Sequence, residues 1–169
     1  MAVTINGSGQ VPVQVKQTVK NDLFTTTSSV PVDITGFSAS ITPTSSSNKI
    51  LVMVNVLIGG SRDTYPYILL LRNGTSVGTG TGATGNQINT FGGAYLTNAV
   101  TATYMANYVS VNWLDSPSTT SSVTYKLQVA SPYNGGYGTG IYINRQEDNS
   151  NVSPIQYGQS SITLMEISG

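Results

Sequence analysis

The sequence predicts an all-β fold, a single antiparallel β-sandwich of about eight strands that is similar to a jelly roll. Apolar residues alternate with polar ones at a period of two, polar turns separate the alternating segments, and no segment carries the apolar stripe and caps of a helix. With 169 residues the chain has the length of one domain. We assign residues 11–169 to the sandwich and residues 1–10, which are small, polar and glycine-rich, to a flexible N-terminal arm.

The first predicted strands follow directly from this alternation. Valines alternate with other residues over residues 11–15, and a second alternation over residues 32–41 changes phase at Gly36, which predicts a β-bulge. Residues 49–58 (KILVMVNVLI) are apolar at nearly every position. We therefore predict that they form a central strand that is covered on both faces.

A hairpin is expected in the next segment. Residues 67–72 run into Asn73-Gly74 and then into residues 75–77, and this pair favours a type I′ turn because both turn residues accept a positive φ. Residues 78–93 have no period and many glycines, so we predict a long surface loop there, without a core element.

The second half of the chain continues the pattern. Residues 94–114 contain strand material with Val109, Val111 and Trp113 on one face, and Asp115 begins the turn that ends it. The remaining predicted strands cover residues 123–130, 140–145 and 162–167.

The composition excludes several classes of function. The chain has no His and no Cys, 7 basic and 7 acidic residues, and a formal net charge of +0. It therefore lacks the side chains for Ser-His-Asp or Cys-His catalysis, thiolate metal sites and disulfides. We expect no nucleic-acid partner because a basic patch is missing, and no signal peptide or membrane insertion because no long apolar run occurs.

Carboxylates are the remaining candidates for catalysis, since a pair of them can cleave glycosidic bonds. Nothing in the spacing places two of them together, and we predict no catalytic residue and no cofactor. The consecutive Glu147, Asp148 and Asn149 could bind calcium, but EF-hand spacing is absent, so we interpret them as a solvated loop without a metal. The carboxylates considered are Asp33, Asp63, Asp115, Glu147, Asp148 and Glu166.

Aromatic residues in glycine- and proline-rich turns are candidates for ligand contact, because their faces bind sugars or a partner's surface. The alternative is that these tyrosines close the ends of the sandwich. The predicted ligand-facing residues are Tyr65, Tyr67, Asn86, Tyr133 and Tyr137. The aromatic residues expected in the core or at a subunit interface are Tyr104, Tyr108, Trp113 and Tyr125.

Four blocks of sequence occur in an order that resembles a known family. They are residues 24–54 (FTTTSSVPVDITGFSASITPTSSSNKILVMV), 112–128 (NWLDSPSTTSSVTYKLQ), 142–145 (YINR) and 160–167 (SSITLMEI). Together they resemble a β-sandwich module of tailed-bacteriophage virion proteins, particularly those of phages that infect cyanobacteria. The opening MAVTING is similar to that group as well.

The resemblance implies a non-enzymatic structural protein, usually a homotrimer, that is made in the host cytoplasm and lies on the virion surface. A capsid decoration (cement) protein is the first expectation, because only a short segment precedes the module. The alternative is a tail-fibre tip that recognises host surface glycans.

The expected partners are further copies of the chain and the major capsid protein or other virion proteins. The alternative role adds a host surface glycan. The residues expected to contact the capsid or a neighbouring subunit are Met1, Ala2, Val3, Thr4, Ile5, Val11, Val13 and Val15.

Overall fold

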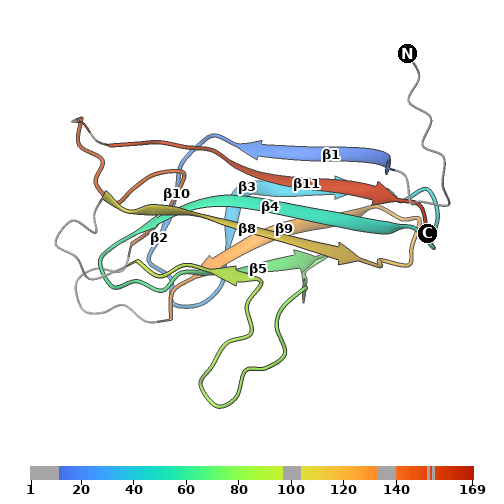
Figure 1. Cartoon of the computed structure of the whole chain (residues 1–169), viewed down its shortest axis with the longest axis horizontal. Helices are drawn as coiled ribbons and strands as arrows, with labels where there is room; N and C mark the ends of the chain where they lie inside the picture. Colours follow the sequence, from blue (N-terminus) through green and yellow to red (C-terminus); the bar gives the residue numbers. More distant parts are fainter. Residues whose placement is uncertain (1–11, 97–103, 133–139, 152, 154) are drawn as a thin grey trace.

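The protein is a sandwich of two antiparallel β-sheets (Figure 1). The computed structural model describes residues 12–96, 104–132, 140–151, 153 and 155–169, and these contain strands and turns but no α-helix. The predicted all-β fold is therefore confirmed.

Two sheets divide the strands between them. Sheet A contains β1 (Pro12–Lys20), β2 (Phe24–Thr26), β4 (Lys49–Gly60), β8 (Ala106–Asp115), β10 (Ile141–Ile143) and β11 (Ser160–Ile167). Sheet B contains β3 (Val32–Ile41), β5 (Tyr67–Arg72), β6 (Thr75–Val77), β7 (Gly92–Gly93) and β9 (Val123–Ala130). The short β2 and β7 were not predicted, because two or three residues are too few to show a period.

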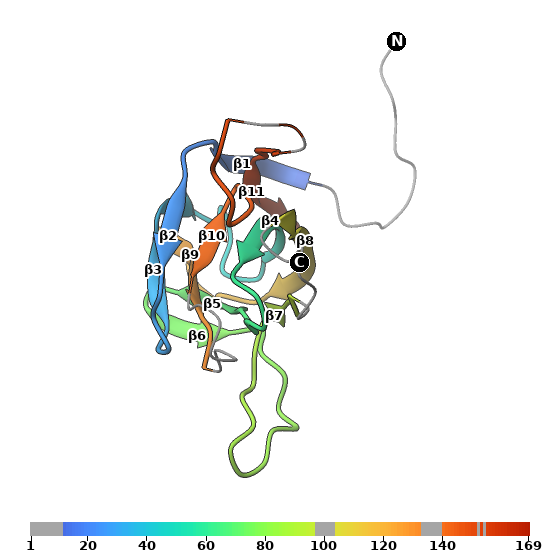
Figure 2. The same ribbon diagram turned by 90° about the vertical axis from the view of Figure 1, so that its left-hand side faces the viewer.

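The order of the main strands is that of a jelly roll. Sheet A runs β1-β11-β4-β8, with β10 and β2 continuing it at one end of β4, and sheet B runs β3-β9-β5-β6. Each sheet thus joins strands that are far apart in the sequence, as two Greek keys require. Figure 2 shows the two layers from one end of the sandwich.

The hydrophobic core fills the space between the sheets. Alternate residues of β4 point inward and are almost completely buried, and inward residues of β3, β5 and β9 meet them from the other layer. The core residues of these strands include Phe37, Ile50, Val52, Val54, Val56, Ile58, Ile68, Leu70, Tyr125 and Leu127.

Two local predictions are confirmed in the backbone. Gly36 has a φ of +73°, and the register of β3 against β9 shifts between Asp33 and Ser38, as expected of a bulge. Asn73 and Gly74 both have positive φ, of 48° and 89°, which is the geometry of a type I′ turn.

The prediction for residues 78–93 is wrong at one end. Most of the segment projects from the sandwich between β6 and β7 (Figures 1 and 2). Phe91, however, is only 6% exposed and belongs to the core. A Cβ atom on Gly92 would lie 2.9 Å from both Val109 and Val111, so the missing side chain lets the end of the loop pack against β8.

The prediction for β4 is half correct. β4 is central, with β11 and β10 along one edge and β8 along the other. Its outer face is covered only in part, however, because Leu51 and Met53 are half-buried there whereas Leu57 is 8% exposed. A strand that is apolar on both faces is therefore not always covered on both faces by other parts of its own chain.

Candidate functional site

The outer face of sheet A, turned away from sheet B, carries a row of apolar side chains. Leu114 of β8, Leu51 of β4, Met165 of β11 and Val15 of β1 are successive partners in the strand pairing, so their side chains lie side by side. Val15 is 52% exposed and Leu114 42%, and the two residues between them are half-buried. We call these four residues the apolar row.

Uncharged residues flank the apolar row on one side. The next row along the strands holds Asn112, Met53, Thr163 and Gln17, and the row after it holds Ser110, Asn55, Ser161 and Val19. The face thus combines an apolar row with neutral polar neighbours that donate and accept hydrogen bonds. The row on the other side of the apolar row holds Ile167 and Lys49, and Lys49 is the one charged neighbour among these described residues. Depletion of charge around apolar residues is typical of the central part of a protein interface.

The outer face of sheet B has a different character. The Asp33 carboxylate accepts hydrogen bonds from Lys126 Nζ at 2.6 Å and from Gln128 Nε2 at 2.8 Å, and Ser40 bonds to Thr124 at 2.7 Å. The hydrogen bond from Lys126 lowers the pKa of Asp33. Polar side chains on this face form hydrogen bonds with one another across the strands, whereas the outer face of sheet A exposes the apolar row to solvent.

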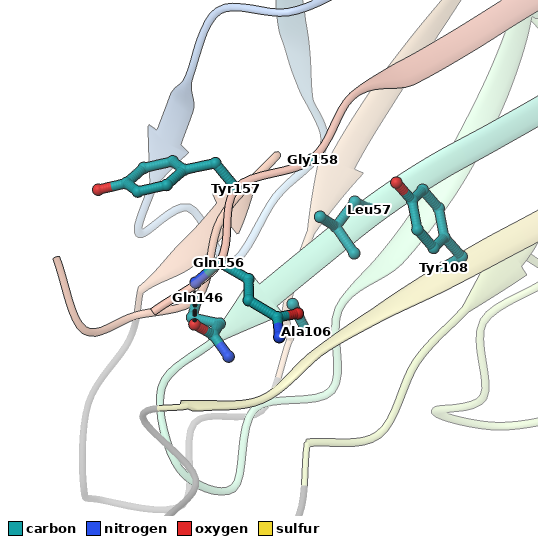
Figure 3. Close-up of a pocket in the computed structure, with 7 residues that line it drawn as sticks. All are labelled: Leu57, Ala106, Tyr108, Gln146, Gln156, Tyr157 and Gly158. Atoms are coloured by element: carbon teal, nitrogen blue, oxygen red, sulfur yellow. Dashed lines mark hydrogen bonds between the residues drawn. The ribbon is translucent and has the colours of Figure 1, made fainter. Parts of the chain in front are cut away.

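A pocket of about 310 Å³ lies further along the outer side of sheet A, near the other end of β4 (Figure 3). Its position at Leu57 is roughly 20 Å along β4 from the apolar row. The residues that line it are Leu57, Ala106, Tyr108, Gln146, Gln156, Tyr157 and Gly158.

One wall of the pocket depends on a glycine. A Cβ atom on Gly158 would lie 2.6 Å from Leu57 Cδ2 and 2.9 Å from the Tyr108 hydroxyl, so any larger residue would displace the ends of these two side chains. The Tyr108 hydroxyl donates to the Gln159 carbonyl at 3.2 Å, which holds the ring in place while leaving the residue 51% exposed.

Two glutamine amides form the polar side of the pocket. Gln146 is 8% exposed; its Nε2 donates to the Tyr104 carbonyl, and its Oε1 accepts a hydrogen bond from the Gln156 backbone at 2.9 Å. The side-chain amide of Gln156 is exposed and makes no hydrogen bond within the described part of the chain. Figure 3 shows the Gln146 and Gln156 side chains close together, with the Tyr157 ring turned away from them.

The lining of the pocket carries no charge. Arg145 precedes Gln146, but its guanidinium lies 4.1 Å from the centroid of the Tyr142 ring. It also donates to the carbonyls of Gln146 and Glu147 at 2.8 Å and 2.7 Å. This cation is therefore held outside the pocket.

Glu166 is a buried carboxylate on the inner side of β11, with 0% exposure. Its Oε1 accepts hydrogen bonds from Thr44 N at 2.6 Å, Thr44 Oγ1 at 2.9 Å and Asn48 Nδ2 at 2.6 Å, and its Oε2 accepts one from Gln14 Nε2 at 2.6 Å. Burial by itself raises the pKa, but the hydrogen bonds from Asn48, Gln14 and Thr44 outweigh it and lower the pKa of Glu166 to about 2. The group ties β1 and the β3–β4 turn to β11.

Asp115 is a second buried carboxylate; β8 ends at this residue, where the sequence predicted the end of the strand, but its burial was not predicted. It is the last residue of β8, is 3% exposed, and accepts hydrogen bonds from Arg72 Nη1 at 2.7 Å and 2.8 Å and from the Tyr125 hydroxyl at 2.5 Å. Burial, together with this hydrogen bond, raises the pKa of the Tyr125 phenol. Tyr125 lies in the core, as predicted, and the cluster links sheet A to sheet B.

The three residues considered as calcium ligands accept hydrogen bonds from other groups of the protein. Glu147 accepts a hydrogen bond from the Ser61 hydroxyl at 2.5 Å, Asp148 from the Ser150 backbone at 2.8 Å, and Asn149 from the Tyr157 hydroxyl. Among the described residues, no three acidic or other metal-binding side chains gather into a cation site.

The predicted ligand-facing residues do not form one site. Tyr65 is 41% exposed and stacks on Tyr95 with 4.8 Å between ring centroids, and Asn86 is exposed on the loop between β6 and β7. Tyr67 was assigned wrongly: it lies in β5, is 8% exposed, and cannot face a ligand. Tyr133 and Tyr137 lie outside the described residues.

The predicted capsid or subunit contacts are described only in part. Val13 is 43% exposed and Val15 belongs to the apolar row, so both are open to a partner. The other residues of this prediction lie outside the described part of the chain: Met1, Ala2, Val3, Thr4, Ile5 and Val11.

The sequence reasoning missed the pocket glutamines and placed Tyr108 in the core or at a subunit interface. The segment Gln156-Tyr157-Gly158-Gln159 offers a local signal, because a glycine between aromatic and amide residues permits a close approach. That it meets Leu57 and Tyr108 depends on strand pairing, which has no local signal.

No protein-family model matches the chain, and no curated protein matches it. In the described part of the chain, no segment forms a helix with the length and apolar character needed to span a membrane.

Proposed function

We propose that this protein is a non-enzymatic structural component of a bacteriophage virion surface, and specifically a capsid decoration protein that assembles as a homotrimer. The observation that carries the proposal is the apolar row on the outer face of sheet A. The resemblance of four sequence blocks to virion modules supports the phage context.

The apolar row is suited to a contact between copies of the chain. Its side chains come from four neighbouring strands of a rigid sheet, so a partner meets them at little cost in conformational entropy. An exposed group of this kind marks an interaction site more often than an isolated apolar side chain does. Exposed Val13 continues the apolar surface at the start of β1, next to the N-terminal residues that we expect to contact the capsid.

The carboxylates support a non-enzymatic role because their oxygens are engaged in structural contacts. Asp33 is bound by Lys126, Asp115 by Arg72, and Glu166 by donors from β1 and from the β3–β4 turn. A glycosidase needs two carboxyl groups that face a common substrate.

Sedimentation equilibrium tests the assembly surface. The double substitution Leu51→Gln with Met165→Gln is expected to convert a trimer into monomers, because it places two amides in the centre of the contact. Leu69→Gln is the matched control, since Leu69 is also a half-buried leucine but lies on the outer face of sheet B. A wild-type monomer, or a double variant that stays trimeric, would contradict the proposal.

Labelling of intact virions tests the location. Gold-labelled antibody against the protein is expected over the whole head if it decorates the capsid. The second candidate function, a tail-fibre tip that recognises host glycans, is favoured by the pocket at Tyr108. Label confined to the tail would select that function instead, and unlabelled particles would contradict both.

A further inference from the structure

We propose that the pocket on the outer side of sheet A binds one neutral pyranose ring. The proposal concerns a different site from the apolar row, and it is independent of where the protein sits on a particle. Its basis is the combination of an aromatic wall, an apolar base, glutamine amides and an uncharged lining in a space of about 310 Å³ (Figure 3).

The arrangement of apolar and polar groups fits the two sides of a sugar. A pyranose has a face of C–H groups and an edge of hydroxyls, and aromatic rings pack on such faces while amides bond to neighbouring hydroxyls. Tyr108 supplies an exposed ring, and Leu57 and Ala106 supply apolar contact beside it. The amide of Gln156, which makes no hydrogen bond within the described part of the chain, offers two donors and an acceptor.

The pocket is partly preformed. Both the Nε2 and the Oε1 atom of Gln146 make a hydrogen bond within the protein, which fixes the side chain. Each of these two atoms can still form one more hydrogen bond. Gly158 passes close over Leu57 and Tyr108 and forms part of the wall of the pocket. A preformed site loses less entropy when a small ligand binds.

The volume of the pocket and its uncharged lining limit the kind of ligand that it can bind. The volume is at the lower end of the roughly 300–1,000 Å³ typical of ligand pockets, which suits one ring better than an extended molecule. An acidic sugar or a phosphate would need a cation, and the neighbouring Arg145 is occupied by the Tyr142 ring and by backbone carbonyls. The site therefore selects an uncharged sugar.

Nuclear magnetic resonance titration of the full chain tests the inference. The probes are methyl glucoside, methyl galactoside, methyl mannoside and methyl N-acetylglucosaminide, with glucuronic acid as the charged comparison. We expect at least one neutral glycoside to shift the backbone amides of Ala106, Tyr108, Gln156 and Gly158. The expected Kd is roughly 1 to 10 mM, as for a small ligand held by one ring and a few hydrogen bonds.

Substitutions locate the site. Tyr108→Ala and Gln156→Ala are each expected to weaken binding by about tenfold or more, the first by removing the ring and the second by removing the Gln156 amide. Tyr95→Ala is the matched control, because Tyr95 is 53% exposed, close to the 51% of Tyr108, and does not line the pocket.

Four outcomes overturn the proposal. The first three are the absence of amide shifts with every neutral glycoside, stronger binding of glucuronic acid than of any neutral probe, and unchanged affinity in both pocket variants. Equal weakening by Tyr95→Ala would also overturn it, because the sugar would then lie at the Tyr65–Tyr95 stack.

Discussion

Glu166→Gln tests whether a buried charge stabilises the sandwich. The folded protein holds the pKa of Glu166 at about 2, against an ordinary value of 4.5. Since one pKa unit corresponds to about 1.4 kcal/mol, the ionised carboxylate contributes about 3 kcal/mol to the free energy of unfolding. Four hydrogen bonds are the source of this stabilisation, three of them to one oxygen.

The sign of the pH dependence follows from the lowered pKa. Because the unfolded chain binds a proton on Glu166 more readily than the folded protein does, the contribution is complete above the unfolded pKa of 4.5 and decreases as the pH falls towards 2. Glutamine has no such titration. It also places an NH₂ group opposite the Gln14 amide, which is already fixed by its hydrogen bond to the Thr42 carbonyl at 2.7 Å.

Urea denaturation at a series of pH values measures the effect. Wild-type protein is expected to be more stable than the Glu166→Gln variant at pH 7, and this difference should shrink by about 2 kcal/mol between pH 7 and pH 3. Taking the difference between the two proteins removes the contribution of all other carboxylates. A difference that stays constant over this range, or equal stability at pH 7, would refute the reasoning.

Two further predictions concern stability and are measured by urea denaturation at neutral pH. Asp115→Asn should lower the free energy of unfolding by about 2 kcal/mol, because Arg72 loses its charged partner; a loss below about 0.5 kcal/mol would contradict this. Gly59→Ala should cost about 2 kcal/mol or more, because its Cβ would lie 2.2 Å from the Arg145 carbonyl oxygen. Gly80→Ala, which meets nothing within 4 Å, should be neutral within about 0.5 kcal/mol. Similar losses in both glycine variants would show that the close approach is unimportant.

Predictions that depend on neighbouring residues were the successful ones. The bulge at Gly36 and the turn at Asn73-Gly74 follow from backbone preferences of single residues, and both are present. The prediction that Val109, Val111 and Trp113 share one face of the strand is also correct, because all three lie in or against the core. These features need no knowledge of the rest of the fold.

Predictions that depend on distant residues failed or could not be made. Asp115 looks like a turn residue beside Ser116-Pro117, and only the approach of Arg72 makes it a buried ion-pair partner. Tyr67 follows a proline and looks exposed, but pairing of β5 with β7 and β9 buries it.

The sequence by itself determined that this protein is a sandwich of strands, because a period of two and turn chemistry are local properties of the chain. Tertiary structure alone decided where the surfaces for partners lie. The apolar row exists because the register of four strands aligns Leu51 with residues more than sixty positions away in β8 and β11. The pocket exists because Gly158 crosses over Leu57 and Tyr108. Periodicity shows that a strand has two faces, and only long-range pairing determines what lies beside each face and which one is left uncovered.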